Sequence, residues 1–478
     1  MKHLFFIAVA LCFGFSANAQ EKKWTLRECV EYAMEHNISI KQSELDLQAV
    51  EIDKSDAIGN YLPTINGRVS NSWNTGLTQN VTTGVLQNQT TRNLSAGISV
   101  GISIFDGLRN LRLYQRAKLA RLASQYSLKK MQDDIALFVA NAYLNVLVNK
   151  EVLKVLEQQH QVTLQQLERT QELVDSGVLP SGDLLQIKAT SAEETQQIIA
   201  AENAVKISLI SLAQTLLIED YENFQIAEKE YQVPLDNMLD KSVSEIIEAA
   251  KEERYEVKIA EQNVELAEKD VQISKAAYYP SLSGFFNYNT RESGADRILR
   301  GGIDPDAPTQ VIGQVEDTGQ LVVAPNFAVA TQPPLPFFDQ LYLNDGISYG
   351  LQLSVPILNG FSTRNSVQRS KINVMRTEYQ LKQAKLDLES NVYQAYVDAQ
   401  GAAKAYEAAL VALEAQQKAH QYAQERYDVG LANAFELSQS KFRLTSAESQ
   451  VIQAKYDYIF KLKVLELYFG IPVSEIKL

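Results

Sequence analysis

The chain contains two copies of one structural plan within its 478 residues. A shift of 217 positions aligns residues 26–65 with 243–282, and a shift of 253 positions aligns residues 94–218 with 347–471. Neither alignment needs a gap, and the difference of 36 positions (253 − 217) falls in the loop between paired strands. An internal repeat of this kind predicts that each copy folds into the same elements, here a helix, a strand pair and two further helices.

The first 20 residues have the pattern of an export signal. Lys2 and His3 precede an apolar run at 4–15, which is followed by the small-residue pattern at 17–19. This order predicts a signal peptide over residues 1–19. An N-terminal membrane anchor is the alternative, but the run is shorter than the roughly 20 residues of a spanning helix. We expect no other helix long and apolar enough to span, so strands must cross any membrane.

Charge and cysteine content exclude several classes of protein. The full chain carries 45 basic and 58 acidic residues, a net charge of −13, whereas nucleic-acid binders normally carry a basic surface. Cys29 is the single cysteine after the predicted signal, so the mature chain forms no intramolecular disulfide. Packing and assembly must therefore stabilise the fold.

The sequence contains little that resembles a catalytic centre. His36, His160 and His420 are isolated from one another along the chain, and we expect surface or packing roles for them. Ser438-Gln-Ser-Lys441 matches an S-x-x-K pattern without the other motifs of that enzyme class. We predict that the protein is not an enzyme and uses no cofactor or metal.

Two segments alternate between apolar and small polar residues. Residues 94–105 read LSAGISVGISIF, and residues 347–358 read ISYGLQLSVPIL in the same phase. A period of two gives a strand one apolar and one polar face, and about 9–11 residues is the length of a membrane-crossing strand. A half-buried hairpin of a soluble domain is the alternative that the pattern leaves open.

Each of these segments is expected to pair with a preceding strand. The partners begin after Pro63 and Pro280, which predicts hairpins at about 64–105 and 281–358, the second with a long loop at 291–346. Four strands cannot close a barrel, because about eight is the practical minimum. A membrane location therefore requires several chains to share one barrel, since open strand edges are not tolerated in lipid.

Long helices follow each hairpin. No proline occurs between Gly107 and Gly177 or between Gly360 and Gly430, and apolar residues recur at spacings of three and four. A helix of about 70 residues spans roughly 105 Å and needs partners along its length, which predicts coiled-coil packing. The expected partners and boundaries are return helices at 183–218 and 436–468, shorter helices at 26–61 and 243–278, a linker at 219–241, a first repeat at 20–218 and a second at 242–478.

Two glycine turns end the long helices. Gly177 and Gly430 lie as far from the hairpins as the chain can reach. Glycine permits a left-handed exit from a helix, and Ser181 or Asn433 can cap the helix that follows. The recurrence of the same glycine–aliphatic element in both copies predicts a docking surface, with ordinary helical turns as the alternative.

The whole mature chain resembles the TolC family of outer-membrane efflux proteins. The resemblance is carried by the VGISIFDGLRN and LSVPILNGFSTRN junctions, the YLP and YYP entries to the hairpins and the ERYDVGL turn. It implies a mixed α and β membrane protein, in which a long antiparallel α-helical coiled-coil barrel joins a trimeric 12-stranded β-barrel with four strands per chain.

The resemblance also implies a location, partners and a function. A homotrimer would lie in outer-membrane lipid with its helices in the periplasm, and would meet a periplasmic adaptor (membrane fusion protein) and an inner-membrane RND or ABC transporter. It would be the exit duct of a tripartite export system for small molecules, such as drugs and toxic compounds, or for secreted polypeptides. Type I protein secretion is one alternative. A soluble periplasmic coiled-coil scaffold and a diffusion porin are alternatives from other classes.

By the same resemblance, the glycine turns form a periplasmic tip, and residues just past them form a gate. The adaptor-docking tip comprises Gly177, Val178, Leu179, Gly430, Leu431 and Ala432, and the gate comprises Asp183, Glu436 and Gln439. Gln439 carries no charge, and Ala432 stands where the best-known member has a gating arginine. We hypothesise a gate that rests on Asp183, Glu436 and helix packing. Ordinary first-turn acids favoured by the helix dipole are the alternative.

Overall fold

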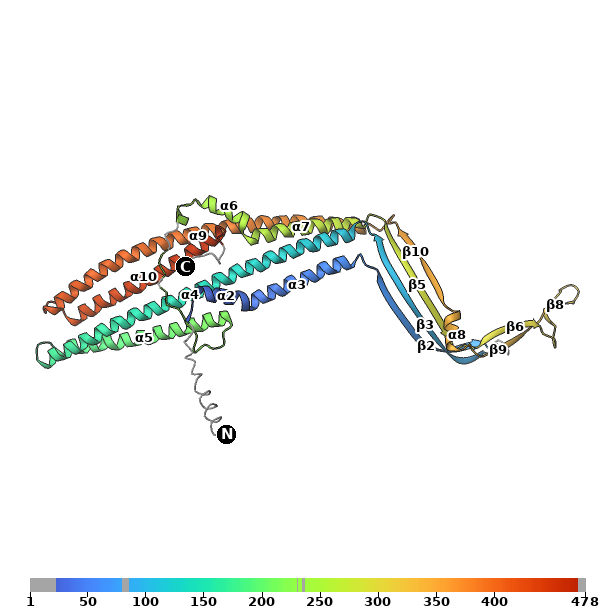
Figure 1. Ribbon diagram of the computed structural model, residues 1–478, viewed down its shortest axis with the longest axis horizontal. Helices are drawn as coiled ribbons and strands as arrows, with labels where there is room; N and C mark the ends of the chain where they lie inside the picture. The colour runs from blue at the N-terminus through green and yellow to red at the C-terminus, as the bar shows by residue number, and fades with distance from the viewer. Residues whose placement is uncertain (1–22, 80–85, 230, 234–236, 472–478) are drawn as a thin grey trace, which may run out of the picture. The chain divides into compact units, whose positions relative to one another are not determined.

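The computed structural model describes residues 23–79, 86–229, 231–233 and 237–471 (Figure 1). The predicted signal peptide at 1–19 lies outside the described residues. The chain divides into two compact units, which we describe separately. The helical unit comprises Met1–Ile52, Lys118–Glu268 and Ile372–Leu478, and the sheet unit comprises Asp53–Ala117 and Lys269–Lys371.

The two copies fold into the same elements in the same order. The first copy contains α2 (Leu26–His36), α3 (Ile38–Gly59), β2 (Thr64–Gln79), β3 (Leu86–Phe105), α4 (Arg109–Asp175) and α5 (Ser181–Leu216). The second contains α6 (Val243–Glu253), α7 (Tyr255–Ala276), β5 (Ser281–Ser293), β10 (Gly346–Ser354), α9 (Ser362–Asp428) and α10 (Ala434–Tyr468). The long helices α4 and α9 both have 67 residues, and the shift of 253 brings their ends into register.

The shorter helix of each copy is interrupted, so the continuous helix predicted there is wrong. Asn37 and Arg254, which the shift of 217 aligns, both have extended backbone, with ψ of 132° and 133°. The Asn37 side chain accepts a hydrogen bond from the Ser39 N–H at 2.9 Å. Arg254 is buried and lies 2.9 Å from Glu256 and 3.4 Å from Asp133. In both copies these polar contacts lie at a break in the helix, and the spacing of apolar residues in the sequence does not reveal that break.

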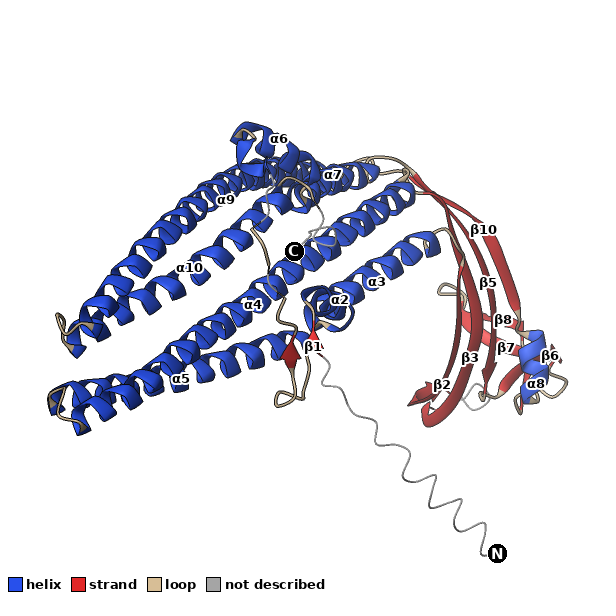
Figure 2. Cartoon of the chain, turned by 60° about the vertical axis from the view of Figure 1, so that its left-hand side comes forward, coloured by secondary structure: helices blue, strands red, loops and turns tan. Residues whose placement is uncertain are grey.

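The sheet unit contains one four-stranded antiparallel sheet in the order β10-β5-β3-β2, which Figure 2 shows as neighbouring arrows. The register places Val100 opposite Ile65 and Phe286, and Ser99 opposite Asn66 and Asn287. Because side chains alternate along a strand, the two faces differ in character. One face carries Ile65, Val69, Ile98, Val100, Phe286, Tyr288, Ile347, Tyr349, Leu351 and Leu353, and the other carries Asn66, Arg68, Ser70, Ser95, Ser99, Asn287, Asn289, Ser348 and Gln352. The predicted two-faced hairpins are therefore present.

The long loop of the second hairpin is itself folded. It contains two antiparallel pairs and a short helix, namely β6 (Arg297–Ile303) with β9 (Phe327–Gln332), β7 (Thr309–Gln314) with β8 (Leu321–Pro325), and α8 (Phe337–Leu343). The Gln340 side chain bonds the Ser293 N–H at 3.0 Å and the Ser293 carbonyl at 3.1 Å, and Thr290 donates to the Leu341 carbonyl at 2.6 Å. These bonds fasten α8 to the end of β5.

The helical unit has its main core where the ends of several helices meet. The short strands β1 (Lys23–Trp24) and β4 (Gln225–Ile226) pair in parallel, and the Tyr143 hydroxyl donates to the Ala227 carbonyl at 2.9 Å. The linker between the copies therefore contributes a strand and a core residue, Ile226, and also a short 3-10 helix, η1 (Asn237–Asp240).

One helix contradicts the expectation that no second segment is apolar enough to span a membrane. Among the described residues, α4 alone contains an 18-residue stretch that is apolar enough by length and composition, and 39% of that stretch is buried. Val139, Tyr143 and Leu147 of α4 lie in the core of the helical unit. Burial among other helices requires the same apolar composition as lipid contact.

The glycines that follow the strand pairs provide a matched stability test. Gly107 and Gly360 have φ of 71° and 58°. A Cβ added at Gly107 would lie 2.5 Å from the Ala276 carbonyl oxygen, whereas a Cβ added at Gly360 would meet no atom of another residue within 4 Å, its two chain neighbours aside. Each alanine substitution costs about 1–2 kcal/mol for the left-handed backbone, and Gly107→Ala must also displace Ala276. We expect Gly107→Ala to lower the thermal midpoint, followed by circular dichroism, more than Gly360→Ala. Equal shifts would contradict this close approach.

Candidate docking tip and gate region

Both glycine turns close the long helices with the same hydrogen bonds. Gly177 and Gly430 have φ of 76° and 79°. The Val178 N–H bonds the Leu173 carbonyl at 2.8 Å and the Gly177 N–H bonds the Val174 carbonyl at 3.0 Å. The second turn repeats this pattern. It is the Schellman motif, in which a left-handed glycine lets the chain satisfy the last carbonyls of a helix.

The turns expose aliphatic side chains. Val178 is 66% exposed and Leu431 is 72% exposed, and Val429 beside them is also exposed. Leu179 is half-buried. Ala432 differs from the other predicted tip residues, because it packs against a small buried cluster.

That cluster joins the two copies just inside the turns. It contains Ile187 of α5, Tyr427 of α9, and Ala434 and Leu437 of α10. The Tyr427 and Thr170 hydroxyls lie 3.4 Å apart. The structure therefore brings the predicted tip residues of both copies to one end of the helical unit.

The two acidic gate candidates occupy equivalent positions but have different surroundings. Asp183 and Glu436 are each the third residue of their helix. Glu436 lies 3.5 Å from Arg426, and both side chains are about half exposed, so the pair contributes little stability. Leu173 stands at the position in the first copy that corresponds to Arg426. Asp183 therefore has no equivalent arginine beside its helix.

Only one of the two predicted caps is present. The Asn433 side chain accepts the Glu436 N–H at 2.9 Å. Ser181 is the first residue of α5 and not its cap, because Pro180 occupies the cap position without a side-chain bond. Proline at the cap position leaves the first N–H groups of α5 without that side-chain acceptor.

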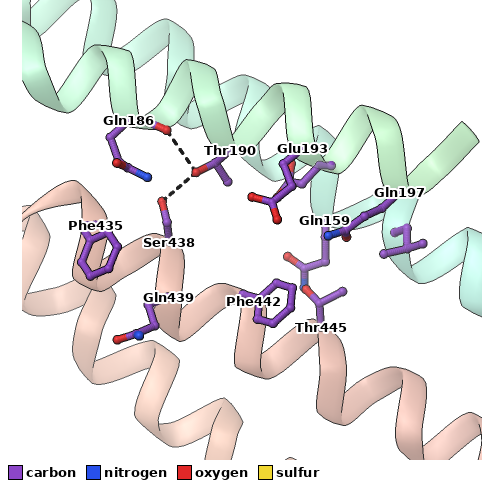
Figure 3. Close-up of a pocket in the computed structure, with 12 residues that line it drawn as sticks. Gln159, Gln186, Thr190, Glu193, Gln197, Phe435, Ser438, Gln439, Phe442 and Thr445 are labelled. Atoms are coloured by element: carbon purple, nitrogen blue, oxygen red, sulfur yellow. Dashed lines mark hydrogen bonds between the residues drawn. The ribbon is translucent and has the colours of Figure 1, made fainter. Parts of the chain in front are cut away.

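The third gate candidate, Gln439, lines a hollow between α5 and α10 that Figure 3 shows. Thr190 of α5 and Ser438 of α10 meet there through hydroxyls 3.2 Å apart. Phe435 and Phe442 also line the hollow and are more than half exposed. Its lining is thus aromatic and uncharged on the α10 side.

A buried ionic network lies next to this hollow and connects the two copies. Lys441 of α10 is 7% exposed, and its ammonium donates to the Gln159 carbonyl at 2.5 Å and to the Thr163 hydroxyl. It also lies 3.2 Å from the Glu194 carboxylate of α5. Glu194 accepts from Thr163 at 2.7 Å and lies 3.1 Å from the His160 ring. The ammonium of Lys441 on α10 thus bridges α4 and α5 of the first copy.

Burial changes the ionisation of the groups around this network. Burial lowers the pKa of Lys441, an effect that Glu194 partly opposes. Burial, together with the charge of Lys441, lowers the pKa of His420. Burial also raises the pKa of the Glu448 carboxyl, whose oxygen lies 3.4 Å from the Gln159 side-chain nitrogen.

Comparison with known proteins decides the family. Residues 30–216 and 246–470 match the model of a family described as outer membrane efflux protein. The chain belongs to this family. The predicted family, fold and outer-membrane location are therefore confirmed, and the helical part lies in the periplasm.

Known relatives of this efflux protein align with it over most of their length. Protein CyaE of Bordetella pertussis is 22% identical over 432 residues, covering 89% of this chain and 79% of the relative. Outer membrane protein TolC of Vibrio cholerae is 23% identical over 380 residues, covering 78% of this chain and 75% of the relative. The CusC crystal structure matches with a TM-score of 0.71 at 15% identity, covering 93% of this chain and 92% of CusC.

Sequence reasoning about this efflux protein missed the buried network. In the sequence, Lys441 is only the end of an S-x-x-K pattern, and the isolation of His160 predicts a surface or packing role. A lysine on the apolar stripe of α10, between Leu437 and Leu444, was the available signal, because an unpaired charge is rarely buried.

The network predicts a specific stability pattern. Lys441→Met should destabilise the helical unit by about 3 kcal/mol, because the Glu194 carboxylate, whose side chain is 15% exposed, is left without its cation. Lys441→Met with Glu194→Met should be less destabilised than Lys441→Met alone. Lys418→Met, which removes an exposed lysine, should stay within about 0.5 kcal/mol of the wild type. Urea unfolding followed by circular dichroism measures all three; a double variant less stable than Lys441→Met would refute the pairing.

Proposed function

We propose that three copies of this chain form one 12-stranded barrel and a periplasmic helical tunnel, which together serve as the exit duct of a tripartite export system. The observation that carries this proposal is the two-faced sheet of β10, β5, β3 and β2. Its apolar face suits lipid, and its Ser- and Asn-rich face suits a water-filled lumen.

The edges of this sheet support assembly from several copies. Within the described residues, β2 and β10 each pair on one side only. Successive strands are antiparallel, so β10 of one copy can pair antiparallel with β2 of the next and continue the sheet. Four strands are too few to close a barrel, and three copies provide 12.

The exposed turns support the proposed docking site for the adaptor. Gly177, Val178, Leu179, Gly430 and Leu431 present backbone and aliphatic side chains at one end of the helical unit, whereas Ala432 supports the turn from inside. A periplasmic adaptor with apolar residues at its own tip would cover these side chains. An inner-membrane RND or ABC transporter would supply the energy.

The proposed cargo is small molecules, with secreted polypeptides as the alternative. Deletion of the gene should raise intracellular accumulation of a fluorescent export substrate if the duct serves efflux. If it serves type I secretion, a polypeptide should instead disappear from the medium while dye accumulation is unchanged. The duct predicts a detergent-extracted mass of three chains by light scattering, and a mass of one chain would contradict it.

If the apolar face of the sheet contacts lipid, an arginine should reduce trimer assembly at Val100 but not at the neighbouring Ser99. Val100→Arg puts a charge on the apolar face and should cost about 2–4 kcal/mol near the middle of the bilayer. Ser99→Arg puts the same charge on the opposite face and should assemble normally. Immunoblots of outer-membrane fractions measure the amount of trimer. Equal trimer from both variants would contradict the lipid assignment of the apolar face.

The gate hypothesis predicts a change in conductance. Asp183→Ala with Glu436→Ala should raise single-channel conductance in planar bilayers, because both first-turn charges and the Arg426 contact are lost. The matched control, Glu172→Ala with Glu425→Ala, removes two acids from equivalent positions in the last turns of α4 and α9. Unchanged conductance in the first variant, or an equal rise in the control, would exclude a specific gate at Asp183 and Glu436.

A further inference from the structure

We propose that Arg68 and Arg291 form an anion-binding site on the polar face of the four-stranded sheet, where they take the carboxylate or phosphate groups of exported small molecules. This inference rests on the proposed duct, in which the polar face lines the lumen, and it narrows the class of cargo. The evidence is the distribution of charge over this face and a hollow that both arginines line.

The polar face carries positive charge only. Arg68 of β2 lies opposite Gly97 of β3, which lies opposite Asn289 of β5, and Arg291 of β5 lies opposite Ser95 of β3. Because side chains alternate along a strand, these five residues share one face. The other residues that the register of the four described strands places on this face carry no charge. A chain with a net charge of −13 therefore presents a positively charged surface here.

No acidic side chain compensates the two arginines. Glu292 follows Arg291 in the chain, but alternation places it on the opposite face. There its carboxylate is buried and lies 3.7 Å from the guanidinium of Arg92. Asp345 precedes β10 and is not among the residues that line the hollow. Within the described part of the chain, Arg68 and Arg291 therefore form no ion pair, and both side chains are exposed.

Small residues of β3 form the floor of the hollow between the two arginines. Ser95, Gly97 and Ser99 line it there. A Cβ added at Gly97 would lie 2.9 Å from the Asn289 side-chain oxygen and 2.9 Å from the Tyr288 carbonyl oxygen. A larger residue at this position would have to displace its neighbours. The floor is therefore low, and it leaves space for a ligand between two long side chains.

The chemistry of the hollow suits an oxyanion. The spacing of strands and of residues places the Cα atoms of Arg68 and Arg291 roughly 12 Å apart, on either side of β3. A guanidinium donates two parallel hydrogen bonds to a carboxylate or a phosphate. Asn66, Asn289 and Asn344 also line the hollow, and their side-chain amides can donate further hydrogen bonds to the same ligand. A cationic ligand would be repelled by both arginines.

Assembly would strengthen the effect of these arginines. In the proposed barrel, each of the three chains contributes one such site to a single lumen. A water-filled passage with walls of low dielectric constant focuses the potential of the charges that line it, so anions accumulate there. Rings of arginine or lysine side chains favour anions in pores for the same reason. We therefore expect cargo with carboxylate or phosphate groups to pass this part of the duct preferentially.

The first measurement is the ion selectivity of the full-length protein in planar bilayers, from the reversal potential in a gradient of potassium chloride. Arg68→Gln with Arg291→Gln should lower the chloride-to-potassium permeability ratio about twofold or more, because a charge several ångströms away changes the energy of an ion in water by about RT. Arg68→Lys with Arg291→Lys keeps the charge and should keep the wild-type ratio. At about 1 M salt, where charges are screened within about 3 Å, the wild type and the glutamine variant should converge.

The second measurement tests binding itself, with inorganic pyrophosphate and citrate as anionic probes. Either probe, added to the wild type, should reduce the single-channel current at low salt, and the glutamine variant should lose this block. The lysine variant should show a weaker block than the wild type, because an ammonium lacks the planar fork of a guanidinium. A block by citrate alone would assign the site to carboxylates, and a block by pyrophosphate alone would assign it to phosphates.

The outcomes separate this site from the duct. Immunoblots of outer-membrane fractions should show equal amounts of trimer for the wild type and both double variants, because the exchanged side chains are exposed. If wild-type channels conduct but neither probe blocks them, or if the glutamine variant keeps the wild-type permeability ratio, the anion site is wrong and the duct proposal stands. A wild type that forms no channels would overturn both proposals.

Discussion

The unsatisfied edges of the four-stranded sheet are the constraint on which the rest of the molecule depends. Within the described residues, β2 and β10 each have a partner on one side only. A backbone N–H or C=O without a partner costs several kcal/mol in hydrocarbon, so the sheet cannot remain open in a membrane. The apolar face of Val100, Phe286 and Tyr349 makes water an equally poor environment. Association of copies satisfies both requirements at once.

The helices meet a related constraint in a different way. Helices of 67 residues satisfy their own backbone but require neighbours along their whole length. Near the tip, contact between the repeats uses polar groups, with Lys441 held by Glu194 and Thr163. Burying such a pair adds little net stability, but its geometry penalises other registers strongly because a displaced partner leaves a charge unpaired. We infer that the network fixes the register of α10 on α4 and α5.

The repeat made much of the fold predictable. Because two sequences with one plan must share their elements, the two shifts gave the paired strands, the long helices and both turns. The interruptions at Asn37 and Arg254 were missed, since each depends on a local turn whose polar side chains also fit a continuous helical pattern. The buried network was missed because Lys441, Glu194 and His160 are far apart in sequence and meet only when the repeats pack. Sequence periodicity reports which face is buried, not which side chain reaches across it.

One difference between the two copies concerns the contact between the repeats of one chain. The shift aligns Lys441 with Lys188, but it aligns Glu194 with Ala447. The contact within the chain therefore contains a largely buried carboxylate for Lys441, and the corresponding position of the second copy carries none. Separating the repeats of one chain would leave the Glu194 carboxylate, which is 15% exposed, without the cation of Lys441. Because this separation has an electrostatic penalty, the two repeats of one chain should move as one piece near the tip.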